Sequence, residues 1–114
     1  MTDQTCNWNG ASGKKYLYHV KTLPVNFTAN QNGNYIYTKI VDNKWSPIYI
    51  GQGDLGDRIG PNHQQANCIK NKGATHVHTH LNSVEKNRTD EESDLLANYT
   101  NAYAPNGCNE KIGG

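Results

Sequence analysis

Positive charge is scarce in this sequence. The formal net charge is only +1 over 114 residues, which excludes a strong overall basic field. A nucleic-acid surface would therefore have to come from local clusters of lysine and arginine. Arginine occurs only at Arg58 and Arg88, so the placement of these two side chains is informative.

Long apolar segments are absent as well. Hydrophobic residues make up 34% of the chain, its mean hydropathy is -0.87, and no apolar run approaches the length that spans a bilayer. The first residues also lack the basic and apolar parts of a secretion signal. We therefore expect a soluble, cytoplasmic protein with one small core and no membrane partner, because the length allows a single domain.

Cysteine is rare and odd in number. Cys6, Cys68 and Cys108 are far apart in the sequence, a spacing that fits neither a disulfide framework nor a zinc site built from paired cysteines. We therefore expect all of them to be reduced thiols.

Against this polar background, several segments alternate between apolar and polar residues, as strands with one buried face do. Tyr16 to Val20 is the first such segment, and it is a candidate extra strand after an irregular arm at residues 1–13. Tyr35 to Gly51 predicts a hairpin around the loop Asp42-Asn43-Lys44. Ala74 to Leu81 predicts a further strand.

The predicted hairpin places Tyr37 directly opposite Tyr49 and has one aliphatic and one aromatic face. Its aliphatic face carries Ile36, Ile40, Ile48 and Ile50. Its aromatic face carries Tyr35, Tyr37, Lys39, Trp45 and Tyr49. We expect the aliphatic face to pack on the core and the two phenols to converge on the other side of the sheet.

Helix signals occur between and after these strands. A short helical turn is predicted from Asp54 to Ile59, and a helix of about ten residues is predicted from Asn62, ended by Gly73. A capping box, Thr89-Asp90-Glu91-Glu92, predicts the start of a final helix that runs toward Pro105. The elements together predict an α/β (α+β) fold in which helices flank a small three-stranded antiparallel sheet. Within it we divide the chain into an N-terminal extension, residues 1–33, and a domain, residues 34–114.

The hairpin also carries a motif. Tyr35-Ile36-Tyr37, then eleven residues, then Tyr49-Ile50-Gly51 resembles the signature of the GIY-YIG endonucleases, with Tyr35 in place of the first glycine. The residues that follow stand in the order in which that family carries its arginine, histidine, metal-binding glutamate and asparagine: Arg58, His63, Glu92 and Asn109. The resemblance covers about residues 34 to 110.

The resemblance implies a metal-dependent endonuclease that hydrolyses DNA phosphodiesters, of the kind found in phages and mobile elements. Glu92 would bind Mg²⁺ or Mn²⁺, which prefer oxygen ligands. Arg58 has the planar, permanently charged fork that suits phosphate oxygens. Tyr37 would act as general base, and Tyr49 would position the water or the phosphate. Two arrangements are then open: a homodimer that cuts both strands, or a partner DNA-binding protein that supplies specificity.

The remaining site residues have weaker individual signals. His63 is expected to hydrogen-bond a catalytic tyrosine or to shuttle a proton, and Asn109 is expected to hold substrate or water through its amide. We also expect substrate contacts from Tyr35, Lys39, Gly51, Lys70 and Lys72.

Structural interpretations compete with these functional ones. Glu92 occupies the third helical position of the predicted capping box, where its carboxylate would reach back to Thr89, and Glu91 is the ligand if the helix begins elsewhere. Tyr37 and Tyr49 are also ordinary strand formers. A catalytically inactive DNA-binding module of the same fold is therefore the first alternative function.

A second alternative comes from three histidines on one strand. His76, His78 and His80 alternate with Val77, Thr79 and Leu81, so the three imidazoles share one face. Histidines at this spacing bind transition metals in several hydrolase folds. A His-rich metal-binding hydrolase is the function that this pattern favours, and a partly solvated strand face beside the tyrosines is its structural counterpart.

Overall fold

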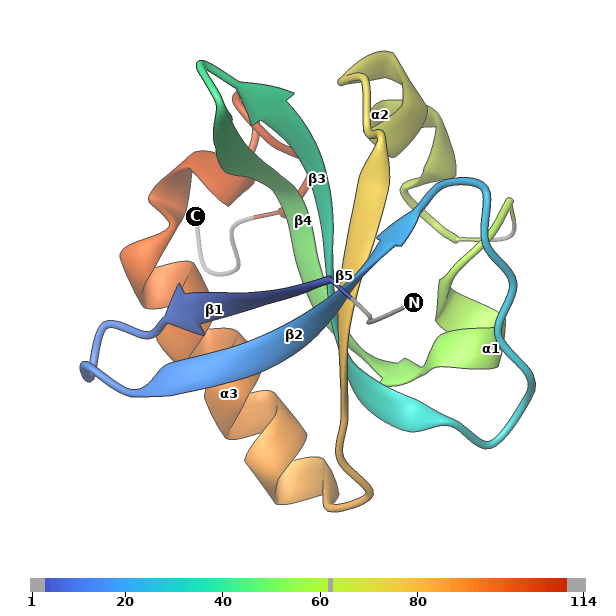
Figure 1. Cartoon of the computed structure of the whole chain (residues 1–114), viewed down its shortest axis with the longest axis vertical. Helices are drawn as coiled ribbons and strands as arrows, with labels where there is room; N and C mark the ends of the chain where they lie inside the picture. The colour runs from blue at the N-terminus through green and yellow to red at the C-terminus, as the bar shows by residue number, and fades with distance from the viewer. Residues whose placement is uncertain (1–3, 62, 111–114) are drawn as a thin grey trace.

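The computed structural model describes residues 4–61 and 63–110 and has an α+β fold, with helices on both sides of one curled antiparallel sheet (Figure 1). The sheet has five strands in the order β1-β2-β5-β3-β4. Their bounds are β1 Thr5–Asn9, β2 Lys15–Thr22, β3 Asn32–Val41, β4 Lys44–Asp54 and β5 His76–Leu81. The α+β class is confirmed, but the prediction of three strands is wrong.

The two additional strands come from the N-terminal part of the chain. β2 confirms the candidate strand at Tyr16 to Val20, and it pairs with β5. The prediction of an irregular arm is wrong for β1, which pairs with β2 along its whole length. Only Trp8 of β1 is deeply buried, too little to produce a visible alternation in the sequence. The strands β1 and β2 of the predicted N-terminal extension, residues 1–33, thus belong to the same sheet as the strands of the predicted domain.

The hairpin β3–β4 forms as predicted near Tyr37, which pairs with Tyr49, but its register changes beyond that pair. The turn has two residues, Asp42 and Asn43, both with positive φ, which matches the twist of a hairpin better than the predicted longer loop. A bulge between Tyr37 and Thr38 compensates for the difference. The bulge moves Ile48 onto the tyrosine face, whereas Trp45 moves to the opposite face.

The helices follow their predicted order with shifted ends. α1, Leu55–Arg58, is capped by Asp54, and α2, Ala66–Asn71, is followed by Gly73 at φ +87°. The predicted start of α2 at Asn62 lies outside the described residues. α3, Glu85–Asn98, begins before the predicted capping box, and a short 3₁₀ turn, η1, Thr100–Ala102, follows it.

Two hydrophobic clusters, one on each face of the sheet, hold the helices in place. α1 and α2 cover the face that carries Tyr35 and Tyr37, and α3 covers the face that carries Ile36 and Ile50 (Figure 1). The prediction that the aliphatic face packs on the core is therefore confirmed for Ile36 and Ile50, although Ile40 is exposed. Over residues 4–61 and 63–110, none of the helices has the length and apolar character that crossing a membrane requires.

The expectation of three reduced thiols is wrong. Cys68 of α2 and Cys108 form a disulfide with a Cα–Cα distance of 5.9 Å, and Cys6 is the free cysteine. The backbone N–H of Cys108 also donates to the carbonyl oxygen of Ile48 at 2.7 Å. The C-terminal segment is thus fixed both to α2 and to the outer edge of β4.

Candidate functional site

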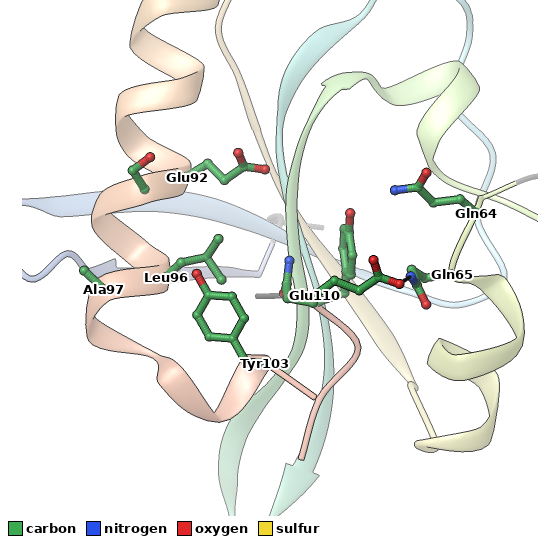
Figure 2. Close-up of a pocket in the computed structure, with 10 residues that line it drawn as sticks. Gln64, Gln65, Glu92, Leu96, Ala97, Tyr103 and Glu110 are labelled. Carbon is green, nitrogen blue, oxygen red and sulfur yellow. Dashed lines mark hydrogen bonds between the residues drawn. The ribbon is translucent and has the colours of Figure 1, made fainter. Parts of the chain in front are cut away.

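A pocket of about 800 Å³ lies beside β4, the strand at the edge of the sheet. Figure 2 shows Glu92, Leu96 and Ala97 on the α3 wall of this pocket and Gln64 and Gln65 on the opposite wall. Tyr49, Glu92 and Asn109, all predicted site residues, line it together, as do Gln64, Gln65, Ser93, Leu96, Ala97, Tyr103 and Glu110.

Glu92 is a carboxylate without a hydrogen-bond partner among the described residues. It lies within α3, so it is not the third residue of a capping box, and Thr89 donates instead to the carbonyl oxygen of Lys86 at 3.0 Å. Burial raises the pKa of Glu92, and the charge of Arg58 opposes this shift. The capping interpretation is therefore wrong, and the partly buried carboxylate suits a cation.

Glu91, the alternative ligand, faces a different part of the protein. Its side chain is almost completely buried, accepts a hydrogen bond from the Tyr18 hydroxyl, and lies 3.0 Å from Nδ1 of His80. Because its oxygens are engaged away from the pocket, the geometry favours Glu92 as the ligand.

Arg58, the last residue of α1, lies against Gly53 of β4 and does not line the pocket. A Cβ placed on Gly53 would be 2.8 Å from Nε of Arg58, so the arginine side chain passes directly over that glycine. Its charge lowers the pKa values of Tyr35, His63 and Glu92, although burial outweighs it at Tyr35 and Glu92. The guanidinium is exposed and forms no hydrogen bond or ion pair with the described residues, which leaves it accessible to an anion.

The two motif tyrosines have different surroundings. Tyr37 is buried, its hydroxyl accepts the backbone N–H of Gly60 at 3.3 Å, and burial raises its pKa. It lines a separate groove, together with Ile59 and Lys70. Tyr49 is only partly buried and lines the Glu92 pocket. The structure therefore places Tyr49, rather than the predicted base Tyr37, beside the metal-binding candidate.

Gly51, the last residue of the motif, makes room for these aromatic rings. A Cβ at this position would lie 2.6 Å from the Tyr35 hydroxyl oxygen and 2.8 Å from a ring carbon of Tyr49. The Tyr35 and Tyr49 rings stack with their centroids 6.0 Å apart. Glycine is thus required because two phenols cross the strand, and Tyr35, the departure from the family motif, is part of the same packing.

His63 lies at the centre of the tyrosine cluster. Its ring has edge contacts with Tyr35, Tyr37 and Tyr49, the shortest being 4.7 Å between centroids, to Tyr49. Burial, followed by the charge of Arg58, lowers its pKa. The expected hydrogen bond to a tyrosine is present, but Tyr35 is the partner.

The side-chain amide of Asn109 is hydrogen-bonded to the backbone of β4. Its Oδ1 accepts the backbone N–H of Ile50 at 2.8 Å, and its Nδ2 donates to the carbonyl oxygen of Ile50 at 2.9 Å. The side chain thereby replaces a neighbouring strand at the edge of β4. Asn109 therefore supports the wall of the pocket, in contrast to its expected role as a ligand of substrate or water.

The lysines expected to contact substrate lie elsewhere. Lys70 lines the groove beside Tyr37, Lys72 donates to the carbonyl oxygen of Pro105, and none of Lys39, Lys70 and Lys72 lines the Glu92 pocket. Sequence reasoning missed Gln65 and Glu110, which hydrogen-bond each other at 3.2 Å across the mouth of the pocket. Neither belongs to a recognisable pattern, because only the fold brings them together.

The three histidines of β5 share one face, as predicted, but it is the face covered by α3 and not the tyrosine face. Nδ1 of His78 accepts the indole N–H of Trp8 at 2.9 Å. His76 packs on the ring of Trp45, and His80 contacts Glu91. Across residues 4–61 and 63–110, no three His, Cys, Asp or Glu side chains are grouped as metal ligands. The separate partners of the histidines disfavour a His-rich hydrolase.

Compared with models of known families, with curated proteins and with solved structures, the chain matches none of them. We therefore infer its function from the residues and their geometry.

Proposed function

We propose that this protein is a metal-dependent DNA endonuclease of the GIY-YIG type. The observation that carries the proposal is the partly buried carboxylate of Glu92, which has no hydrogen-bond partner among residues 4–61 and 63–110, shares one pocket with Tyr49 and interacts electrostatically with Arg58. Tyr49 of β4 and Glu92 of α3 line this pocket, whereas Arg58 of α1 does not line it and supports the proposal through its charge, which lowers the pKa of Glu92. Phosphodiester hydrolysis needs an activated water and stabilisation of charge on phosphorus, and these groups can supply both.

Each residue has a role that follows from its surroundings. Arg58, exposed and charged at every working pH, binds phosphate oxygens through its planar fork. Tyr49 orients and activates the attacking water, because this residue lines the Glu92 pocket and its hydroxyl has no partner among the described residues. Tyr37 has a structural role in the core, since its hydroxyl already accepts the N–H of Gly60.

The donors in the pocket fit a hard divalent cation. Glu92 offers one carboxylate, and such ions often bind one or two carboxylates and complete their coordination with water and phosphate. Mg²⁺ or Mn²⁺, when bound there, would neutralise phosphate charge and favour ionisation of water. Glu110 adds a second carboxylate at the mouth of the pocket.

A cleavage assay tests the proposal. Supercoiled plasmid and mixed linear DNA are incubated with the protein and Mg²⁺, Mn²⁺ or EDTA. We expect metal-dependent nicking that falls by at least about a hundredfold in Glu92→Gln and Arg58→Ala. Glu85→Gln, an exposed change on the same helix, is the matched control. Absence of cleavage by the unmodified protein, or unchanged cleavage by Glu92→Gln, would contradict the proposal.

A second candidate function, DNA binding without turnover, is favoured by the departure at the start of the motif. Tyr35 fills the space over Gly51 and occupies His63, so less of the aromatic cluster is free for chemistry than in a motif that begins with glycine. DNA binding that depends on Arg58, without cleavage in either metal, would favour this candidate. Sedimentation of the protein with and without DNA would show whether it acts as a homodimer.

A further inference from the structure

The β1–β2 hairpin lies outside the part of the chain that carries the nuclease motif, yet it is bonded to α3. The Tyr18 hydroxyl of β2 donates to the Glu91 carboxylate, and His80 of β5 contacts the same carboxylate at 3.0 Å. Glu91 and Tyr18 are both almost completely buried. Hydrogen bonds between buried groups depend on direction and are costly to break, so this contact fixes one point on the helix surface.

A second attachment lies about one turn further along the helix, at Asp94. Its carboxylate accepts the backbone N–H of Ser12 at 2.8 Å, the Ser12 hydroxyl at 2.6 Å and the Tyr16 hydroxyl at 2.7 Å. The backbone N–H of Ala11 also donates to the carbonyl oxygen of Asp94 at 3.0 Å. The turn of the hairpin thus holds this residue through both its side chain and its backbone.

The end of α3 is attached in the same way. The Asn98 side chain donates to the carbonyl oxygen of Asn9 at 2.8 Å, and the backbone N–H of Asn9 donates to the Tyr99 hydroxyl at 3.1 Å. The Trp8 ring packs edge-on against Tyr99 at 5.1 Å. The attachments therefore run from Glu91 to Tyr99, along the second half of the helix.

These bonds restrict the rotation of the helix about its own axis, together with the bonds of Arg88 to Asn34 and Gln52. Leu95 packs into the core, but hydrophobic contact has no preferred direction and tolerates small rotations of a helix. Successive residues of an α-helix are separated by about 100° around the axis. Fixing Glu91 toward β2 and β5 therefore turns Glu92 toward β4, where it lines the pocket (Figure 2).

We propose that the β1–β2 hairpin is a brace, with Tyr18 and Tyr16 as positioning residues that hold α3 in the rotation that directs Glu92 into the pocket. The inference rests on the proposed function for the role of Glu92. It assigns a purpose to the N-terminal extension: the hairpin acts through Glu91 and Asp94, and it touches neither substrate nor metal.

Two measurements on the full chain test the brace. The variants are Tyr18→Phe and Tyr16→Phe, each of which removes one hydroxyl that reaches α3. Thr38→Val is the matched control, because it removes a buried hydroxyl that bonds the backbone of His76 and not α3. Hydrogen exchange reports how firmly the α3 amides are held. Calorimetric titration with Mn²⁺ alone reports the metal affinity, and therefore whether Glu92 remains in place.

We expect Tyr18→Phe to accelerate exchange within α3 relative to α2 and to weaken Mn²⁺ binding by about tenfold. A high Mn²⁺ concentration should then restore cleavage, which a general loss of structure would not allow. Tyr16→Phe should act in the same direction and serves as the test if Tyr18→Phe fails to fold. Exchange and Mn²⁺ affinity equal to those of Thr38→Val in both tyrosine variants would overturn the brace.

The two proposals can fail separately. If the unmodified protein neither binds Mn²⁺ nor cleaves DNA, the proposed function fails. The rate of hydrogen exchange in α3 then decides by itself whether the hairpin holds the helix. If the unmodified protein cleaves DNA but the hairpin variants match the control, the brace fails and the function stands.

Discussion

The hydroxyl oxygen of Tyr35 lies 2.7 Å from Nε2 of His63, and a second contact to the same ring determines which of the two atoms donates. The backbone N–H of Gln65 donates to Nδ1 of the same ring at 2.9 Å. In the neutral ring, Nδ1 is then the acceptor and Nε2 carries the proton that Tyr35 receives. Both ring nitrogens of His63 therefore have partners within the protein, the Tyr35 hydroxyl and the backbone N–H of Gln65.

Replacing Tyr35 by phenylalanine tests that arrangement. Tyr35→Phe keeps the ring over Gly51 but leaves the buried Nε2–H of His63 without its acceptor. We expect a loss of about 1–3 kcal/mol in the free energy of unfolding, measured by urea denaturation. Tyr49→Phe is the control, since its hydroxyl has no partner among the described residues and its removal should change stability by less than about 0.5 kcal/mol. Equal stability of both variants would argue against the bond.

The shape of the cation at position 58 should matter as much as its charge. Arg58→Lys keeps a positive charge but loses the planar fork that contacts two phosphate oxygens. We therefore expect Arg58→Lys to reduce kcat/KM for plasmid cleavage by about tenfold, which is part of the larger loss expected for Arg58→Ala. Activity near that of the unmodified protein would mean that only the charge is used.

The disulfide should stabilise the C-terminal wall of the pocket. Cys68 and Cys108 are 40 residues apart in the sequence, so breaking their bond releases a long loop in the unfolded chain. We expect Cys68→Ala combined with Cys108→Ala to lose about 2–4 kcal/mol of unfolding free energy and to loosen Asn109, the neighbour of Cys108. Cys6→Ser is the control, and a reducing agent should reproduce the double variant in the unmodified protein only.

His78 should make the protein sensitive to acid. Burial, followed by the charge of His76, lowers the pKa of His78 from 6.5 to about 4. As the pH falls below 6.5, His78 takes up a proton in the unfolded chain, whereas in the folded protein it does so only near pH 4. The free energy of unfolding is therefore highest at neutral pH and decreases as the pH falls from 6.5 to about 4.

The measurement is urea denaturation between pH 7 and pH 4. We expect His78→Gln, whose side-chain oxygen can still accept the Trp8 N–H, to lose less stability than the unmodified protein across the window, by on the order of 2 kcal/mol. Parallel curves for the two proteins would show that His78 is not the group responsible.

Local patterns were sufficient to identify many elements. Alternation predicted β2, the hairpin β3–β4 and β5, because one buried face imposes a period of two residues. Asp54 and Gly73 marked a helix start and a helix end through their own side-chain and backbone preferences. These signals depend on residues that are close together in the chain, and they can therefore be recognised without knowledge of the tertiary structure.

Other features depended on contacts between distant segments. β1 is a strand because Trp8 packs against His78 and Tyr99, not because its five residues favour one. The bulge after Tyr37 changed the face of Ile48, and a one-residue change in register always has this effect on a strand. The disulfide likewise required α2 and the C-terminal segment to meet.

The candidate site divides in the same way. By itself the sequence determined which residue types are present and in what order: two motif tyrosines, an arginine, a histidine, a glutamate and an asparagine. Only the tertiary structure decided that Tyr49 rather than Tyr37 shares a pocket with Glu92, that Glu91 is bound to Tyr18, and that Asn109 braces β4. The physical reason is that burial and hydrogen-bond partners are properties of the packed chain. They depend on residues from distant segments, and the periodicity of a single segment carries no information about those residues.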